Sequence, residues 1–261
     1  MSASESPILF TCADDVATIT LNRPEKRNAL NEAMWIGLAE AVRKADAMTE
    51  AKIVVIRGAA GHFAAGADIS EFDVVYATRE RSVQYRKAVE DGARAITDAV
   101  KPVIAMIEGA CVGGGMAIAL ACDLRIAGDT AKCGITPAKL GIVYSFGDTK
   151  WLVEAVGPSK AKDILFTGRI MDASEALAIG LVDEVHPAAA LERAIAVKSA
   201  LIAGNSQWSV RGAKETVRLI VSGAANAEPA AERSSGVSEQ ADFREGRAAF
   251  LEKRAPKFPY R

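Results

Sequence analysis

Two glycine-rich turns are the first candidates for chemistry in this sequence. "HFAAGAD" (62–68) and "GACVGGGMA" (109–117) each lie between a predicted buried strand and a predicted helix. Such a junction leaves backbone N–H groups without partners, and the helix dipole favours negative charge there. If the two turns meet, each directs one N–H at the same carbonyl oxygen, and together they form an oxyanion hole. The alternative is that the glycines only permit close packing of helix against strand.

A site that stabilises an anion also needs a group that moves a proton. In the following stretch, "CGITPAKLGIVYSFGDTKW" (133–151), the polar candidates are Tyr144, Ser145 and Asp148. Tyr144 is a candidate proton donor, and Asp148 is a candidate base or nucleophile. The structural alternatives are an aromatic residue at the edge of the core and an acid in the first turn of a helix. Glu71, in "DISEF", is a further acid near the first glycine turn and is expected to line the pocket.

Other chemistries do not fit the motifs. "GACVGGG" is not followed by Lys and Ser or Thr, and "GGGMAI" lacks the last glycine of a dinucleotide-binding turn. No G-x-S-x-G motif is present, which argues against a serine hydrolase. The four cysteines form no C-x-x-C pair and only two histidines occur, so small buried thiols are favoured over a zinc site.

Composition narrows the class of protein. The 261 residues carry 32 Lys and Arg against 33 Asp and Glu, so no basic field favours nucleic acid as a partner. Half of the residues are hydrophobic, which suits a substantial core. The N-terminal stretch has no basic region, and no apolar run of about 18 residues occurs anywhere. We therefore expect a cytoplasmic protein that does not enter a membrane.

The elements that must position these residues alternate between strand and helix. "VATITL", "KIVVIRG", "PVIAMIEG" and "LRIAG" read as strands, and residues 79–100 read as an amphipathic helix. Asn31 is a predicted N-cap for the helix that follows it. This alternation predicts an α/β core over residues 1–198. Residues 199–261 are predicted to be a helical C-terminal region, which forms either a second layer or an oligomerisation arm.

Four longer stretches resemble a known family. "NRPEKRNALN", "FAAGADISEF", "KPVIAMIEGACVGGGMAIALACDLRIA" and "FTGRIMDASEALAIGLVDEV" occur in order and are similar to the enoyl-CoA hydratase/isomerase family, the crotonase superfamily. The resemblance implies a spiral of ββα units with a helical C-terminal region, assembled as a homotrimer or homohexamer. It also implies an acyl-CoA substrate, in which coenzyme A is part of the substrate and no separate cofactor is needed.

The resemblance assigns roles to individual positions. It places the oxyanion hole at the backbone N–H groups of Ala67 and Gly114, in agreement with the two turns. It also implies a set of residues that bind coenzyme A or cover it, with the last two reaching a neighbouring subunit's ligand: Lys26, Arg27, Ala29, Ala65, Asp68, Ile69, Phe250 and Lys253.

This sequence departs from the hydratase pattern at both expected glutamates. Ala117 stands where the first would follow the three glycines, and Pro137 stands at the second. The stretch "ITPAKLGIVYS" is closest to the methylmalonyl-CoA decarboxylase branch, although that branch has a histidine where Ala67 stands. We therefore expect decarboxylase-like or other atypical enolate chemistry rather than efficient hydration. The alternatives are an acyl-CoA-binding protein with little catalysis and, less in keeping with the motifs, a nucleotide-binding module.

Overall fold

The computed structural model describes residues 6–224 and 228–260 of the chain. Its main sheet has the strand order β1-β2-β3-β4-β6-β9, and only the β1–β2 pair is antiparallel. The strands are β1 (Ile8–Ala13), β2 (Val16–Leu21), β3 (Ile53–Gly58), β4 (Val103–Ile107), β6 (Leu124–Gly128) and β9 (Glu184–His186). The main sheet is thus parallel over most of its width, in keeping with the predicted α/β core.

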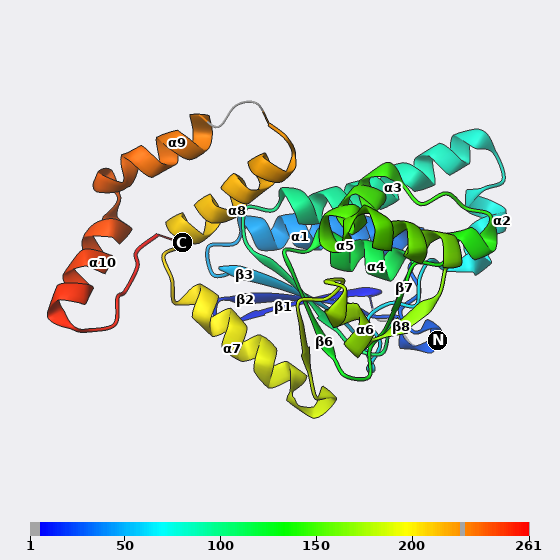
Figure 1. Cartoon of the computed structure of the whole chain (residues 1–261), viewed down its shortest axis with the longest axis horizontal. Helices are drawn as coiled ribbons and strands as arrows, with labels where there is room; N and C mark the ends of the chain where they lie inside the picture. Colours follow the sequence, from blue (N-terminus) through cyan, green and yellow to red (C-terminus); the bar gives the residue numbers. More distant parts are fainter. Residues whose placement is uncertain (1–5, 225–227, 261) are drawn as a thin grey trace.

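Helices cover both faces of this sheet, which explains the continuous apolar runs of the central strands. All five residues of β4 are buried. On one face lie α1 (Glu32–Ala47), α3 (Arg79–Asp98) and α4 (Gly114–Ala121), and on the other lies α7 (Leu191–Ala203) (Figure 1). Asn31 caps α1 as predicted, because its side chain accepts a hydrogen bond from the Met34 N–H.

A second, smaller sheet produces the ββα repeat. It has the order β5 (Ala110–Val112), β7 (Lys132–Gly134) and β8 (Ile170–Asp172). The chain passes from β4 through β5 into α4, and from β6 through β7 toward α5 (Phe146–Thr167). Each of these units gives one strand to each sheet and then a helix, so the glycine turn before α4 lies where the two sheets meet. Helix α5 is broken at Gly157, whose φ is +76°, just before Pro158.

The C-terminal helices extend away from this core. After α7 come α8 (Gln207–Val221), α9 (Glu228–Ser235) and α10 (Ala241–Glu252), which form an arm at one end of the molecule (Figure 1). Asp242 fastens α10 to the start of α8, because it accepts hydrogen bonds from Ser206 Oγ at 2.5 Å and from the Tyr260 N–H at 3.0 Å. None of the helices in the described part of the chain is long and apolar enough to cross a membrane.

Candidate active site

The two glycine turns lie side by side. Ala64 forms a parallel bridge with Cys111, in which the Ala64 N–H donates to Ala110 O and the Val112 N–H donates to Ala64 O, both at 2.9 Å. The main chain therefore holds the turn after β3 against the turn before α4. This adjacency is the condition under which two backbone N–H groups can serve one oxygen.

In the first turn, the backbone around Ala67 is held by Leu30. The Leu30 N–H donates to Gly66 O at 2.7 Å, and the Asp68 N–H donates to Leu30 O at 2.8 Å. The flanking groups are occupied in this way, and Ala67's own N–H has no acceptor among the described residues. Gly66 has a φ of +115°, a conformation that residues with a side chain rarely adopt.

In the second turn, Gly113 is the N-cap of α4, with a φ of +52° and a ψ of −111°. Its N–H donates to Gly134 O at 2.9 Å, which leaves Gly114 as the first residue of the helix. The Gly114 N–H has no acceptor in the described parts of the chain, as expected for the first donor of a helix. A Cβ built on Gly114 would lie 3.8 Å from the Ala67 nitrogen, so the two unpaired amides are neighbours.

These amides open into a cavity of about 800 Å³. Its walls come from the first turn, the start of α4, the loop after β7 and one face of α3. Among the residues predicted as functional, this cavity brings together Ala65, Ala67, Ile69, Gly114, Tyr144, Ser145 and Asp148. The structure therefore places both the proton-transfer candidates and the two amides around one space.

Tyr144 is half-buried in this wall, and its hydroxyl lies 3.5 Å from Gly113 O. Burial raises the pKa of Tyr144 well above its ordinary value, and the negative charge of Asp148 raises it further. The phenol is therefore neutral at physiological pH and keeps a proton to donate.

Ser145 and Asp148 form a closed pair at the start of α5. Ser145 Oγ donates to Asp148 Oδ2 at 2.7 Å, and the Asp148 N–H donates to Ser145 Oγ at 3.1 Å. Ser145 is therefore the N-cap of α5, and Asp148 lies in the first turn of this helix, which is the structural role considered for it above. Asp148 also lines the cavity while only 7 % exposed, and burial raises the pKa of its carboxyl. The same acid thus lies in the first turn of α5 and in the wall of the cavity.

Comparison with known proteins identifies the family. A model of the enoyl-CoA hydratase/isomerase family matches residues 11–261. The chain belongs to this family. It is 38% identical to a probable enoyl-CoA hydratase of Mycobacterium tuberculosis over 253 residues, covering 94% of this chain and 95% of the relative. It is 33% identical to the 2,3-dehydroadipyl-CoA hydratase of Escherichia coli, covering 97% of this chain and 98% of the relative.

The fold of the enoyl-CoA hydratase/isomerase family is also confirmed. An enoyl-CoA hydratase/isomerase family protein from Hyphomonas neptunium has a crystal structure that superimposes with a TM-score of 0.95. The two share 46% identity over 98% of each chain. The predicted spiral of ββα units with a helical C-terminal region is therefore correct, and the chain is a member of the crotonase superfamily of enzymes.

Ala117 and Pro137, which stand where the resemblance expects the two hydratase glutamates, both line the cavity. Ala117 stands in the first turn of α4 and is 2 % exposed, and Pro137 begins the 3₁₀ turn Pro137–Leu140. Neither side chain can exchange a proton. The acids that do line this cavity are Asp148 and Glu90, and Glu90 was not singled out in the sequence.

Asp68 and Glu71 both make hydrogen bonds within the protein near the first turn. Asp68 is buried and accepts hydrogen bonds from Ser70 Oγ at 2.6 Å and from Arg23 Nη2 at 2.9 Å, and these contacts lower the pKa of its carboxyl. Glu71 accepts a hydrogen bond from the Glu32 N–H at 3.0 Å, at the start of α1. Neither residue lines the cavity of the hole.

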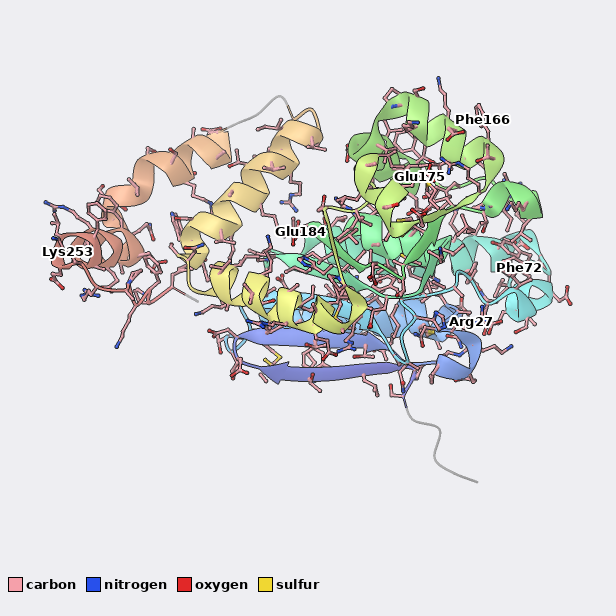
Figure 2. All side chains as sticks on the ribbon, turned by 60° about the horizontal axis from the view of Figure 1, so that its bottom comes forward. Arg27, Phe72, Phe166, Glu175, Glu184 and Lys253 are labelled. Carbon is pink, nitrogen blue, oxygen red and sulfur yellow. The ribbon has the colours of Figure 1, made fainter. Side chains whose placement is uncertain are left out.

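The other predicted coenzyme A residues lie at two ends of the molecule. Lys26 and Arg27 are exposed next to the first turn, where Arg27 O accepts a hydrogen bond from the Ala65 N–H at 3.0 Å, and Ala29 follows them. Phe250 and Lys253 belong to the end of α10, and Figure 2 shows Lys253 far from Arg27. Within the single chain, neither Phe250 nor Lys253 lines the cavity.

Several residues of α3 line the cavity. They recur at helical spacing along one face of the helix: Arg79, Ser82, Val83, Arg86, Val89 and Glu90. The period of three to four residues was available in the sequence, but it marks a face of the helix without showing what that face contacts.

The buried cysteines Cys111, Cys122 and Cys133 are free thiols, and no cluster of three metal-binding side chains occurs in residues 6–224 and 228–260.

Proposed function

We propose that this protein is an acyl-CoA enzyme that stabilises a thioester enolate in the hole formed by the Ala67 and Gly114 N–H groups. The observation that carries the proposal is the pair of adjacent unpaired amides above one cavity. Each N–H donates to the thioester oxygen, and the donation strengthens as negative charge develops on that oxygen. Loss of one such donor typically costs about 10²–10³ in rate.

The proposed chemistry is decarboxylation or another atypical enolate reaction rather than efficient hydration. Hydration needs a base to activate water and an acid to protonate carbon, and Ala117 and Pro137 supply neither. In decarboxylation, the bond from Cα to the carboxylate breaks, CO₂ leaves, and the electron pair moves to the thioester oxygen. A proton from Asp148 or Tyr144 then forms the new C–H bond. Arg79 favours such a substrate, because it lines the cavity and no ion pair is observed for it among the described residues.

Coenzyme A is proposed to lie along the first turn, on the backbone of Arg27, Ala29, Ala65 and Ile69. Lys26 and Arg27 are exposed cations next to this path, which suits the phosphates. We further propose a homotrimer or homohexamer in which Phe250 and Lys253 cover the ligand of a neighbour. Phe250 is 83 % exposed in the single chain, and burial of this ring against a neighbour would be favourable.

The second candidate function is an acyl-CoA-binding protein with little or no catalysis. The side chains of Ala117 and Pro137 favour it, because they leave the usual acid and base positions of the cavity without a titratable group. Binding needs only the hole and the coenzyme A path, both of which consist mainly of backbone groups.

Turnover by purified protein separates these functions. Crotonyl-CoA, methylmalonyl-CoA, ethylmalonyl-CoA and butyryl-CoA are each incubated with the protein, and products are followed by LC–MS. Loss of CO₂ from a malonyl-type ester with negligible hydration of crotonyl-CoA is the expected result. Fast hydration of crotonyl-CoA contradicts the argument from Ala117 and Pro137. Binding of every ester without conversion favours the binding protein.

A further inference from the structure

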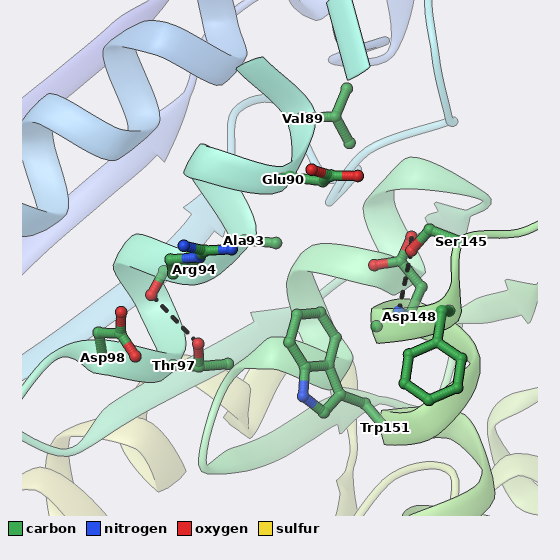
Figure 3. Close-up of a pocket in the computed structure, with 11 residues that line it drawn as sticks. Val89, Glu90, Ala93, Arg94, Thr97, Asp98, Ser145, Asp148 and Trp151 are labelled. Carbon is green, nitrogen blue, oxygen red and sulfur yellow. Dashed lines mark hydrogen bonds between the residues drawn. The ribbon is translucent and has the colours of Figure 1, made fainter. Parts of the chain in front are cut away.

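Two carboxylates meet where the main cavity joins a second one. The second cavity, of about 600 Å³, lies between α3 and α5. Five residues line both cavities and form their common wall: Val89, Glu90, Ser145, Phe146 and Asp148. Figure 3 shows the Glu90 carboxylate extending from α3 toward the Ser145–Asp148 pair on α5. Both acids thus lie in the wall that the two cavities share.

The two carboxylates have different surroundings. Asp148 is 7 % exposed, and the bonded partner of its carboxylate is the neutral Ser145 hydroxyl. The Glu90 side chain is 51 % exposed and lies 3.5 Å from Arg86 Nε, one turn earlier on α3. Burial raises the pKa of Asp148, and the negative charge of Glu90 raises it further. The pair therefore combines a buried carboxyl with a more exposed one, and two carboxyl groups in unlike environments can take the acid and the base role of one reaction.

We propose that Glu90 and Asp148 are the base and the acid of one catalytic couple, with Glu90 taking the α-proton of the acyl group and Asp148 returning a proton to the enolate. The assignment of Glu90 rests on the proposed function, because it needs an acyl-CoA in the hole. In the first step, the Cα–H bond breaks, an O–H bond forms on Glu90, and the electron pair moves to the thioester oxygen. In the second step, the Asp148 O–H bond breaks, a C–H bond forms at Cα, and the electron pair returns from the oxygen. Glu90 then gives its proton to water and Asp148 takes one from water, which returns both side chains to their starting states.

This couple gives the protein a base that neither Ala117 nor Pro137 supplies. It therefore extends the chemistry beyond decarboxylation, which needs no base, to proton abstraction at Cα. Other charged or titratable groups also face these acids. On α3 they are Arg86, Arg94 and Asp98, and from the loop before α5 comes Tyr144.

The test is hydrogen exchange in the full-length protein. Butyryl-CoA, which has no carboxylate to lose, is incubated in D₂O, and deuterium at Cα is measured by mass spectrometry from pD 5 to 9. The variants are Glu90→Gln and Asp148→Asn. The control is Asp91→Asn, because Asp91 is the next acid on α3 but bonds to Arg43 and lines neither cavity. Affinity for butyryl-CoA is measured for each variant by calorimetry.

We expect wild type and Asp91→Asn to exchange at equal rates, with a fall at alkaline pD as the acid loses its proton. Glu90→Gln should lose at least about 100-fold in rate across the range, and Asp148→Asn should lose the alkaline fall. Butyryl-CoA affinity should stay within about threefold. Exchange by Glu90→Gln at the wild-type rate overturns the proposal, and so does wild-type protein that binds butyryl-CoA without exchanging it. If wild type binds no CoA ester at all, the proposed function fails as well, which is a separate outcome.

Discussion

The Ala67 nitrogen lies 3.8 Å from the point that a Cβ on Gly114 would occupy. The same Cβ would lie 3.1 Å from Leu30 Cδ1 and 3.2 Å from Trp35 Cζ2, which are both side-chain atoms able to move slightly. A methyl group at this position therefore needs small shifts of these two side chains, and it would lie beside the Ala67 nitrogen. A substitution at Gly114 can therefore test the proposed oxyanion hole without placing a side chain against backbone atoms that cannot move.

Gly114→Ala is accordingly expected to fold and to lose about 10²–10³-fold in kcat, as when one donor of an oxyanion hole is removed. Steady-state kinetics on the substrate found by the turnover assay, together with circular dichroism, check this. Gly236→Ala is the matched control, because a Cβ there meets no atom within 4 Å. Unchanged kcat in Gly114→Ala contradicts the hole.

Gly115→Ala, in contrast, should lower the stability of the fold rather than act on catalysis directly. A Cβ on Gly115 would lie 2.4 Å from Ala64 O, a backbone atom in the first turn that cannot move aside. We expect a loss of stability of about 1–3 kcal/mol, typical of overpacking. Urea unfolding measures it, and a Gly115→Ala variant as stable as Gly114→Ala would show that the turns are less tightly joined.

The contrast between these glycines explains how far the sequence predicted the site. The pattern "VGGGM" indicated both an anion hole and close packing, and the structure assigns packing to Gly115 and an unpaired N–H to Gly114. Strands β2, β3, β4 and β6 and helices α1 and α3 were predictable, because the strands are alternating or continuous apolar runs and the helices carry apolar residues at helical spacing. Strand β5 was read as a turn, because three residues before a glycine run carry no period.

Side-chain direction was the part that the sequence did not specify. Glu71 and Glu90 are both acids near predicted site elements, yet Glu71 turns back to the Glu32 N–H while Glu90 faces Asp148. Helix α3 carries acids and bases around most of its circumference, so its amphipathic period does not reveal which acid meets the cavity. Only the packing of α3 against α5 and the glycine turns decides it.

Asp68→Asn should destabilise the first turn. Asp68 is 7 % exposed and holds the chain after Ala67 through Ser70 and Arg23, and these contacts lower the pKa of its carboxyl, the Ser70 hydrogen bond most strongly. Because the folded-state pKa is depressed, the stabilisation is present above the ordinary pKa and is lost as pH falls through the folded value. We expect a loss of about 1–3 kcal/mol at pH 7. Denaturant melts at pH 3 and pH 7 measure it, with the exposed Asp73→Asn as control.

The Asp148→Asn variant should show the reverse pH dependence. Burial raises the pKa of Asp148, so the folded state binds a proton more readily than the unfolded state does. The linked stability is present below the ordinary pKa of 3.8 and is lost as pH rises through the folded value. Wild type should therefore lose stability relative to Asp148→Asn as pH rises from about 4 to 7. A stability difference between the two proteins that stays constant across this range would show that Asp148 ionises normally.

Restoring glutamates tests the argument that their absence sets the chemistry. In the double variant Ala117→Glu with Pro137→Glu, both new carboxylates would enter the cavity that the two amides face. Hydration of crotonyl-CoA should rise by at least about 100-fold, the scale on which a positioned acid or base acts.

The matched control is Ala117→Gln with Pro137→Gln, which has similar bulk but transfers no proton. Because Ala117 is 2 % exposed, a new side chain there also costs stability, and a thermal melt of each variant is needed. If the glutamine variant gains as much activity as the glutamate variant, cavity shape rather than proton transfer limits hydration. If neither gains while both fold and bind crotonyl-CoA, these two positions do not face the double bond, and the explanation for weak hydration must be sought at Glu90 and Asp148.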